Sequence, residues 1–243
     1  MSHPAQLRFV GKTKELWPDH FHHKNVLEVG SLDINGSVRG LFDECNYTGL
    51  DVAPGAGVDL VCGGHEHTAP DESYDVVISC ECFEHNPYWE QTLANMWRML
   101  KSDGLIVISC AGSGRAEHGT ARTDPGSSPL TVELGWNYYR NLIPADFENG
   151  ELRRIGVENY WINQNWAAFD LYFVAWKSTL RDKGRADQFS QAAAQLNDWV
   201  TGANSSWLAR VRKSTSFLLG ENNFNRLRHS PLLSRIYYRI EGF

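Results

Sequence analysis

The sequence predicts an α/β protein in which a mostly parallel sheet lies between helices, with an antiparallel closing strand and a helical C-terminal extension. Up to about residue 177, short apolar runs rich in β-branched residues are separated by turn residues and helical stretches. Strands that alternate with helices form parallel βαβ units, with helices on both faces of the sheet. Beyond residue 179 the apolar residues recur at helical spacing instead.

Five apolar runs predict the parallel strands, because each is bounded by polar or turn residues. They are residues 25–30, 47–51, 57–61, 74–79 and 104–109. Between the last two, residues 88–100 carry apolar side chains at helical spacing and precede the helix stop Lys-Ser-Asp-Gly. Two more strands, 152–162 and 170–176, have no helix-length spacer between them. We therefore expect this pair to be antiparallel and to close one edge of the sheet.

The C-terminal part differs from the rest in both periodicity and charge. Three sets of residues are spaced to share a helix face. They are Phe189, Ala193, Leu196 and Val200; Trp207, Val211 and Leu218; and Leu233, Ile236, Tyr237 and Ile240. Residues 205–243 carry a net charge of +5, whereas the rest of the chain carries −11. We predict an α/β domain over residues 1–178 and a basic helical extension over residues 179–243.

Composition excludes several classes of protein. With 243 residues, 42% hydrophobic and 21% charged, the chain is neither disordered nor a disulfide-rich miniature. No apolar run reaches the ~18 residues of a membrane-spanning helix, and the N-terminus lacks the apolar core of a signal peptide. The net charge of −6 argues against nucleic acid as a partner. Five cysteines form an odd set, which favours reduced thiols and a cytoplasmic location.

Two features at predicted strand ends indicate a nucleotide-type ligand. Gly30 ends the first strand, where glycine allows a tight turn, and Gly36 permits close approach of a ligand or helix. Asp51 ends the second strand, 21 residues after Gly30. An acidic residue at that distance can accept hydrogen bonds from both hydroxyls of a bound ribose. An ordinary βα turn is the alternative explanation.

The chain resembles the class I S-adenosylmethionine-dependent methyltransferases over residues 24–112, with the closing strands to residue 177 fitting the same fold. Four segments carry the resemblance in the order of that family. They are Val-Leu-Glu-Val-Gly (26–30), Tyr-Thr-Gly-Leu-Asp (47–51), Ser-Tyr-Asp-Val-Val-Ile-Ser-Cys-Glu-Cys-Phe-Glu-His (73–85) and Met-Leu-Lys-Ser-Asp-Gly-Leu-Ile-Val-Ile-Ser (99–109). The resemblance implies a Rossmann-like, seven-stranded, mostly parallel sheet and S-adenosyl-L-methionine as cofactor.

The resemblance also implies which residues bind the cofactor. Glu28 and Gly30 would border its methionine part, Asp51 would hold its ribose, and Ser31 would also bind the cofactor. The backbone at the end of the fourth strand would line the pocket floor beside the transferred methyl group, at Ser79, Cys80 and Glu81.

The chain departs from the family pattern at two places. Leu32 stands where the family has the second glycine of its first motif. The third strand ends in Cys62-Gly-Gly instead of the usual acidic residue that reaches the adenine amine. His65, Glu66 or a main-chain group are the alternatives for that contact.

We expect methyl transfer to an oxygen atom of a saccharide or another small polar acceptor. A hydroxyl acceptor benefits from a base, and His85 and His118 follow the fourth and fifth strands. Structural alternatives are a helix-capping or pocket-lining role for His85 and an ordinary loop position for His118. The sequence Glu-His-Asn-Pro-Tyr after strand four is not the Asn/Asp-Pro-Pro-Tyr signature of many amino-group methyltransferases.

A long loop over residues 112–146 is predicted to bind the acceptor, because long loops at the carboxyl ends of a sheet are often functional. Arg122, Trp136 and Tyr139 combine a guanidinium with aromatic rings, which suits a polar ring-shaped molecule. Packing of Trp136 and Tyr139 onto the core is the competing interpretation.

No metal site is expected. Three groups of ligand-type residues occur, but none is a complete ligand set at a recognised spacing. They are Asp19 with His20, His22 and His23; His65 with His67; and Cys80 and Cys82 with His85.

The basic extension is expected to pack on its own domain or on a second copy of the chain in a homo-oligomer. Peripheral contact with an anionic membrane stays open, because basic residues alternate with Trp207, Phe217 and Leu232. Two other functions also stay open. Leu32 in the first motif keeps open a catalytically silent binding module. A nicotinamide-dependent oxidoreductase is disfavoured by the absence of a full G-x-G-x-x-G and of a Tyr-x-x-x-Lys pair.

Overall fold

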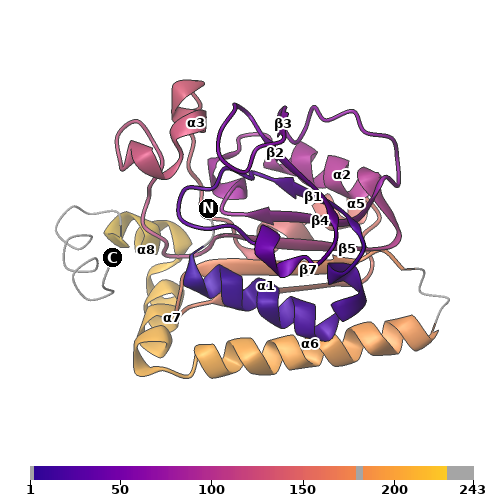
Figure 1. Ribbon diagram of the computed structural model, residues 1–243. Coiled ribbons are helices and arrows are strands. Elements are labelled where there is room, and N and C mark those ends of the chain that lie inside the picture. The colour runs from indigo at the N-terminus through magenta and orange to yellow at the C-terminus, as the bar shows by residue number, and fades with distance from the viewer. Residues whose placement is uncertain (1–2, 179–182, 229–243) are drawn as a thin grey trace.

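The computed structural model describes residues 3–178 and 183–228 of the chain (Figure 1). Seven strands form one sheet in the order β3-β2-β1-β4-β5-β7-β6. The strands are β1 (Asn25–Val29), β2 (Asn46–Asp51), β3 (Leu60–Val61), β4 (Tyr74–Cys80), β5 (Leu100–Ala111), β6 (Tyr160–Asn165) and β7 (Asp170–Trp176). All neighbours are parallel except β7, which is antiparallel to both β5 and β6. The predicted α/β fold with an antiparallel closing strand is confirmed.

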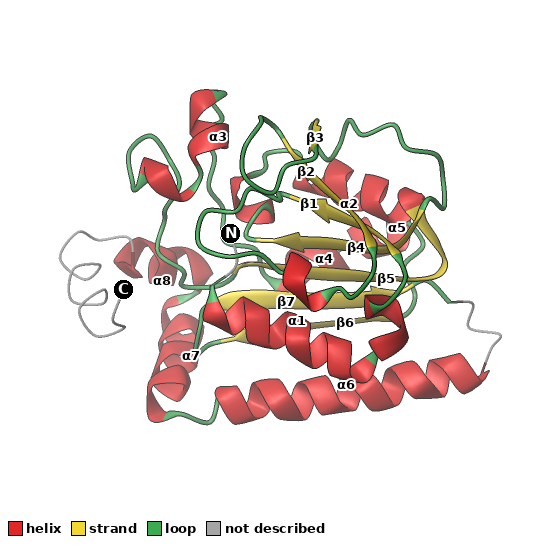
Figure 2. Ribbon diagram, in the orientation of Figure 1, coloured by secondary structure: helices red, strands yellow, loops and turns green. Residues whose placement is uncertain are grey.

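Both faces of the sheet are covered by helices (Figure 2). Alternate residues of a strand point to opposite faces. On β1, accordingly, Val26 enters one apolar cluster and Leu27 enters the other. The first cluster lies under α1 (Pro4–Leu16) and α6 (Lys183–Ala203). The second lies under α2 (Trp89–Met99), α4 (Pro144–Glu148) and α5 (Glu151–Arg154).

Helix α1 was not anticipated from the sequence. Its start is well specified, since the His3 side chain accepts a hydrogen bond from the backbone N–H of Ala5 and Pro4 stands at the first helical position. Phe9, in the middle of the helix, is fully buried and stacks on Tyr172 of β7 with ring centroids 4.1 Å apart. The helix is therefore fixed to the sheet by its aromatic core residue.

The strict alternation of strands and helices is wrong for the first half of the sheet. Between β1 and β2 the only helical element is the 3-10 turn η2 (Arg39–Leu41), and β3 has two residues instead of the five predicted. Lys-Ser-Asp-Gly after α2 lies inside β5 as an irregularity of the ladder, with Asp103 at φ 74°. Residues 152–159, predicted as strand, form the end of α5 and a turn in which Gly156 has φ 77°.

Helix α6 packs directly on the sheet. Leu196 and Val200 are buried, and the indole N–H of Trp161 on β6 donates to Asn197 at 2.7 Å. Helices α7 (Trp207–Leu219) and α8 (Glu221–Arg228) follow. Trp207 and Leu218, predicted to share a face of a helix, are 77% and 81% exposed. The helix expected over residues 233–240 lies outside the described residues. Division of the chain at residue 178 stays a prediction.

Candidate functional site

A narrow cleft lies where β1, β2 and β4 end. It consists of two adjoining pockets of about 50 and 30 Å³ that share Gly30, Asp51, Cys82 and Thr131. Glu81 and His85 line the first pocket, and Val52, Cys62 and Trp136 line the second. The carboxyl ends of parallel strands are where open α/β sheets bind ligands.

Gly30 gives the cleft its floor. Its φ of 83° is one that L-residues rarely adopt, and its N–H donates to the carbonyl of Leu50 at 2.8 Å. A Cβ atom at this position would lie 2.5 Å from the Cβ of Cys82. The turn after β1 therefore depends on glycine for both its conformation and its close contact with the chain after β4.

Asp51 places a carboxylate at the junction of the two pockets. Its oxygens accept hydrogen bonds from the backbone N–H groups of Leu32 at 3.0 Å and Val52 at 2.8 Å. Burial raises the pKa of Asp51, while those two N–H donors partly offset the effect. A carboxylate has about four acceptor positions, so two remain for hydroxyl groups of a ligand.

Four other residues predicted to bind cofactor lie behind the cleft and do not line it, namely Glu28, Ser31, Ser79 and Cys80. Glu28 is buried and accepts a 2.8 Å hydrogen bond from the Tyr47 hydroxyl, and burial raises the pKa of Glu28. Ser79 donates to the carbonyl of Val29 at 2.8 Å. Burial raises the pKa of the Cys80 thiol to about 12, so this thiol stays protonated. The Ser31 hydroxyl is buried and has no hydrogen-bond partner among the described residues.

The cleft is roofed by the segment after β5. The 3-10 turn η4 (Pro125–Ser127) and helix α3 (Pro129–Glu133) contribute residues 127–131 to the lining of the first pocket. Helix α3 projects beyond this end of the sheet (Figure 1). Trp136 closes the second pocket and packs against Tyr88 and His65, with ring centroids 5.5 and 6.2 Å away. His65 and Glu66, the side-chain alternatives for the adenine contact, line neither pocket.

His85 and His118 come together beside the first pocket. Their rings meet edge to face with centroids 4.9 Å apart, and Tyr139 lies 5.4 and 5.1 Å from them. The Nδ1 atom of His118 is 3.0 Å from the carbonyl of Ala116. Because a carbonyl only accepts, Nδ1 carries the hydrogen and Nε2 has the free lone pair.

Burial sets the protonation of both histidines. Burial, assisted by His118, lowers the pKa of His85 to about 3. Burial also lowers the pKa of His118, although the Glu81 carboxylate opposes the effect. Both rings are therefore neutral near pH 7, and each can accept a proton in principle.

Glu81 is the centre of a buried charge network. Its carboxylate lies 3.3 Å from Arg115 and 3.8 Å from Nε2 of His118, and it accepts a short hydrogen bond from Gln6 of α1. Burial alone would raise the pKa of Glu81, but Arg115, His3 and His118 outweigh it and bring the pKa to about 2. The backbone of Glu81 has φ 52°, which turns the chain into the cleft.

Glu84 lies one turn away from Glu81, and its pKa is shifted in the opposite direction. Its Oε1 atom accepts from the N–H of Ala111 at 3.1 Å, whereas Oε2 is buried without a partner among the described residues. Burial, followed by repulsion from Glu81, raises the pKa of Glu84 well above its ordinary value. Two neighbouring carboxyl groups thus have pKa values pushed apart, which is common at functional sites.

Two buried sets of ligand-type side chains lie in this region. One is Glu84, His85 and His118, and the other is His3, Glu81 and Asp170. In the second set Arg115 already bridges the carboxylates, since its guanidinium is 3.3 Å from both Glu81 and Asp170. A guanidinium in that position neutralises the charge that a cation would need, so we interpret the set as an ion-pair network.

Of the three residues predicted to bind the acceptor, Trp136 lines the second pocket, whereas Tyr139 and Arg122 line neither pocket. Tyr139 lies at the histidine pair and donates its hydroxyl to the carbonyl of Ala116 at 3.0 Å. Arg122 is half exposed and pairs with Glu117 at 2.6 Å. Trp136, in contrast, lies in the second pocket beside Val52 and Cys62.

Sequence reasoning missed several residues of the site. Cys82 lines both pockets, and its signal was its place two residues after the end of the fourth predicted strand. Arg115 gave no signal, because its partners Glu81 and Asp170 come from strands far away in the sequence. The contribution of Gln6 had no signal either, since α1 itself was not predicted.

Residues 23–108 match a family model described as a methyltransferase domain. Two solved structures of Haemonchus contortus phosphoethanolamine N-methyltransferase 2 share the fold, with a TM-score of 0.53 and 15% sequence identity. One contains S-adenosyl-L-methionine and the other S-adenosylhomocysteine with phosphomonomethylethanolamine. Each match covers 71% of this chain and 52% of the other, so the chain spans about half the length of these structures.

No curated protein matches the sequence significantly. None of the helices in the described ranges is both long enough and apolar enough to cross a bilayer. The family match covers β1 to β4 and most of β5, and β6 and β7 belong to the same sheet. Residues 23–108 are therefore similar to a methyltransferase domain, and the chain has the fold of the class I S-adenosylmethionine-dependent methyltransferases.

Proposed function

We propose that this protein transfers a methyl group from S-adenosyl-L-methionine to an oxygen atom of a small polar acceptor, a saccharide being the preferred class. The observation that carries the proposal is the junction of Gly30, Asp51 and Glu81 at one cleft in a methyltransferase domain. When bound, the cofactor supplies an electrophilic methyl group attached to a sulfonium sulfur. This sulfur is a good leaving group, so methyl transfer needs no metal.

The residues of the cleft fit the cofactor. The two unused acceptor positions of Asp51 suit the ribose hydroxyls, and the bare backbone of Gly30 leaves room for the methionine part. Trp136, with Val52 and Cys62, offers an apolar wall for the adenine ring. We therefore propose Trp136 as a cofactor contact, in place of the acceptor contact expected from the sequence.

The two pockets are narrow, because residues 127–131 roof them. Binding of a whole cofactor then requires this segment to move outward. Polar and small side chains dominate it, namely Ser127, Ser128 and Thr131.

His118 is the residue we propose as general base. Its Nε2 lone pair is free because Nδ1 donates to the carbonyl of Ala116. In that role Nε2 would take the proton that the acceptor hydroxyl loses on methylation, while the bound cofactor would supply the methyl group and leave as the neutral thioether. The Glu81 carboxylate at 3.8 Å stabilises the imidazolium that results. His85 is the weaker base, since a pKa of about 3 leaves little affinity for the proton.

Tyr139 and Arg122 are proposed to bind the acceptor. Tyr139 packs on both histidines, which puts its ring beside the reacting hydroxyl. Arg122 is half exposed at the outer end of the same loop and can meet a polar group that extends from the acceptor. The likeness to an N-methyltransferase concerns the fold alone, so amines belong in the acceptor screen as well.

The proposal is tested first by calorimetric titration of the full chain with S-adenosyl-L-methionine and S-adenosylhomocysteine. Asp51→Asn should weaken binding at least tenfold, because hydrogen bonds to a charged group contribute about 1.5–3 kcal/mol each. Glu66→Gln is the control, since Glu66 is exposed and lies outside both pockets. No binding by the folded protein would favour a silent binding module or a nicotinamide enzyme.

The acceptor is then identified by transfer of a labelled methyl group to saccharides, other hydroxyl compounds and amines. Label in an ether-linked methyl group of a saccharide supports the proposal. Label found only on amines would contradict oxygen transfer while leaving the cofactor assignment intact.

A further inference from the structure

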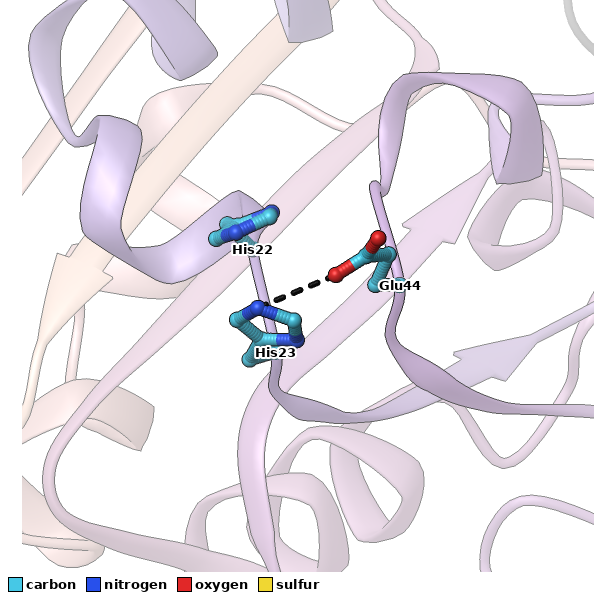
Figure 3. Close-up of side chains that lie close together, drawn as sticks. All are labelled: His22, His23 and Glu44. Atoms are coloured by element: carbon cyan, nitrogen blue, oxygen red, sulfur yellow. Dashed lines mark ion pairs between the residues drawn. The ribbon is translucent and has the colours of Figure 1, made fainter.

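Two histidines and a glutamate gather on the surface at the opposite end of the strands from the cleft. His22 and His23 precede β1, and Glu44 precedes β2 (Figure 3). One ligand atom from each residue lies within 4.8 Å of those from the other two. The Nε2 atom of His23 is 3.0 Å from the Oε2 atom of Glu44, and the two imidazole rings have centroids 3.8 Å apart.

The two backbone segments are tied together beneath these side chains. His22 and Asp43 form a parallel β-bridge, and the N–H of His23 donates to the carbonyl of Asp43 at 3.1 Å. The preceding residue of each segment is aromatic, and Phe21 stacks on Phe42 with centroids 4.5 Å apart in the core. The relative position of the three ligand-type residues is thus fixed by hydrogen bonds and by core packing.

An unusual backbone conformation turns the side chains toward one another. In an extended chain, successive side chains point to opposite sides, so neighbouring histidines would diverge. His23 instead has φ 52°, following the extended His22, and Glu44 also has φ 52°. Non-glycine residues adopt such angles uncommonly. The consequence is that two adjacent imidazoles and a carboxylate from another segment share one side of the surface.

A charged pair and an open surface surround these side chains. Lys14 is engaged by Asp43, the neighbour of Glu44, at 2.6 Å and by the carbonyl of Leu41. Glu44 and His23 are 69% and 63% exposed, so a bound ion would keep water among its ligands.

We propose that His22, His23 and Glu44 form a binding site for a borderline divalent cation of the Zn²⁺, Co²⁺ or Ni²⁺ type. Two imidazoles with one carboxylate are a ligand set that such ions prefer, and three protein ligands leave at least one position for water. This ligand set was not evident from the sequence, because Glu44 is 21 residues from His23. The site is remote from the cleft, so the ion joins the two segments without taking part in methyl transfer.

A cation that binds the folded state alone stabilises it, because the free energy of unfolding rises with the ratio of free ion to Kd. The site therefore predicts a metal-dependent increase in Tm that does not depend on cofactor or acceptor. This inference stands apart from the proposed function, since its measurement requires no activity.

The experiment titrates Co²⁺ and Zn²⁺ into the tag-free full chain, after EDTA treatment and buffer exchange, and follows binding by calorimetry and Tm by scanning calorimetry. We expect one ion per chain whose affinity falls at least tenfold in His23→Ala and in Glu44→Gln, with loss of the Tm increase. His67→Ala is the matched control, because it removes a histidine from another part of the surface and should leave both quantities unchanged.

The visible absorption of bound Co²⁺ adds a check on the ligands, since thiolate ligands from the nearby Cys45 would give intense charge-transfer bands that imidazole and carboxylate do not. Nitrogen and oxygen ligation that is lost in both variants supports the proposal. Absence of binding to the folded wild-type chain, or binding that persists in both variants, would overturn it.

Discussion

The Nε2 atom of His118 lies 3.8 Å from the Oε2 atom of Glu81, across the space between the loop after β5 and the end of β4. Arg115 lies 3.3 Å from the same oxygen and, with His3 and His118, keeps that carboxylate ionised by bringing its pKa to about 2, against the effect of burial. A neutral imidazole that faces a permanent negative charge gains stability when it takes up a proton. This relationship gives the proposed base its driving force.

Replacement of His118 by glutamine should lower kcat by about 10²–10⁴-fold, the usual contribution of a general base. The Kd for the cofactor should change less than twofold, since His118 does not line the pockets. Steady-state kinetics and titration of the two variants His118→Gln and His67→Gln measure the effect against a matched surface histidine. Equal kcat values for the two would remove His118 from the mechanism.

The pH dependence of kcat gives an independent test of the same base. Burial lowers the pKa of His118 below its ordinary value near 6.5, so the neutral form already predominates at neutral pH. We expect log kcat to increase with pH below that pKa and to be flat above it. This acid limb should vanish in His118→Gln, and a limb that stays unchanged would assign the titration to another group.

His85 should make the fold sensitive to mild acid. Its pKa is about 3 in the folded state, whereas a histidine in an unfolded chain titrates near 6.5. The unfolded state then binds more protons, so the free energy of unfolding is highest above pH 6.5 and decreases as the pH falls toward 3. Each pKa unit corresponds to about 1.4 kcal/mol. Urea unfolding at a series of pH values should show a shallower decrease for His85→Gln, and an identical slope would contradict the assignment.

Gly30→Ala tests the floor of the cleft. The added Cβ would lie 2.5 Å from the Cβ of Cys82 on a backbone with φ 83°, so we expect a loss of about 1–3 kcal/mol and of cofactor binding. Gly11→Ala is the opposite control, since nothing lies within 4 Å of the new atom in the middle of α1. That helix substitution should stabilise by about 0.5–1 kcal/mol. Chemical denaturation distinguishes the two, and a neutral Gly30→Ala would refute the close contact.

Leu196→Ala tests how much the packing of α6 on the sheet contributes to the free energy of unfolding. Leu196 is fully buried against the sheet, so its truncation should cost about 2–5 kcal/mol. Leu218→Ala removes the same atoms from a side chain that is 81% exposed and should change stability by less than about 0.5 kcal/mol. Similar losses for both would mean that residue 218 is covered.

The strands that carry the cleft could be predicted because their signal is local. β1, β4 and β5 are rich in buried aliphatic residues, many of them β-branched. Gly30 and Asp51 could be predicted as site residues because each stands at the end of a predicted strand. The two-residue β3 and the turn at Gly156 were not predictable in the same way, since apolar residues occur in loops as well as in strands.

His85 and His118 were each predicted as candidate bases, but their contact and the network around them were not predicted. His85 and His118 lie near predicted strand ends, whereas Arg115, Gln6 and Asp170 meet only through the tertiary fold. Glu44 meets His23 by the same route, through the pairing of two segments that precede different strands. Local patterns contain no information on which distant side chains will neutralise one another.

The layer formed by α1 and α6 has a consequence for the order in which the protein can fold during synthesis. Phe9 of α1 lies against Tyr172 of β7 and Trp199 of α6, so the packing of α1 is completed by residues that are translated much later. β7, made after β6, also inserts between β5 and β6 in the sheet. Because such contacts join distant parts of the chain, the nascent protein must emerge from the ribosome to about residue 200 before this face closes. Until then α1 exposes Phe9 and its other apolar residues, so this helix is a binding target for chaperones that hold apolar segments.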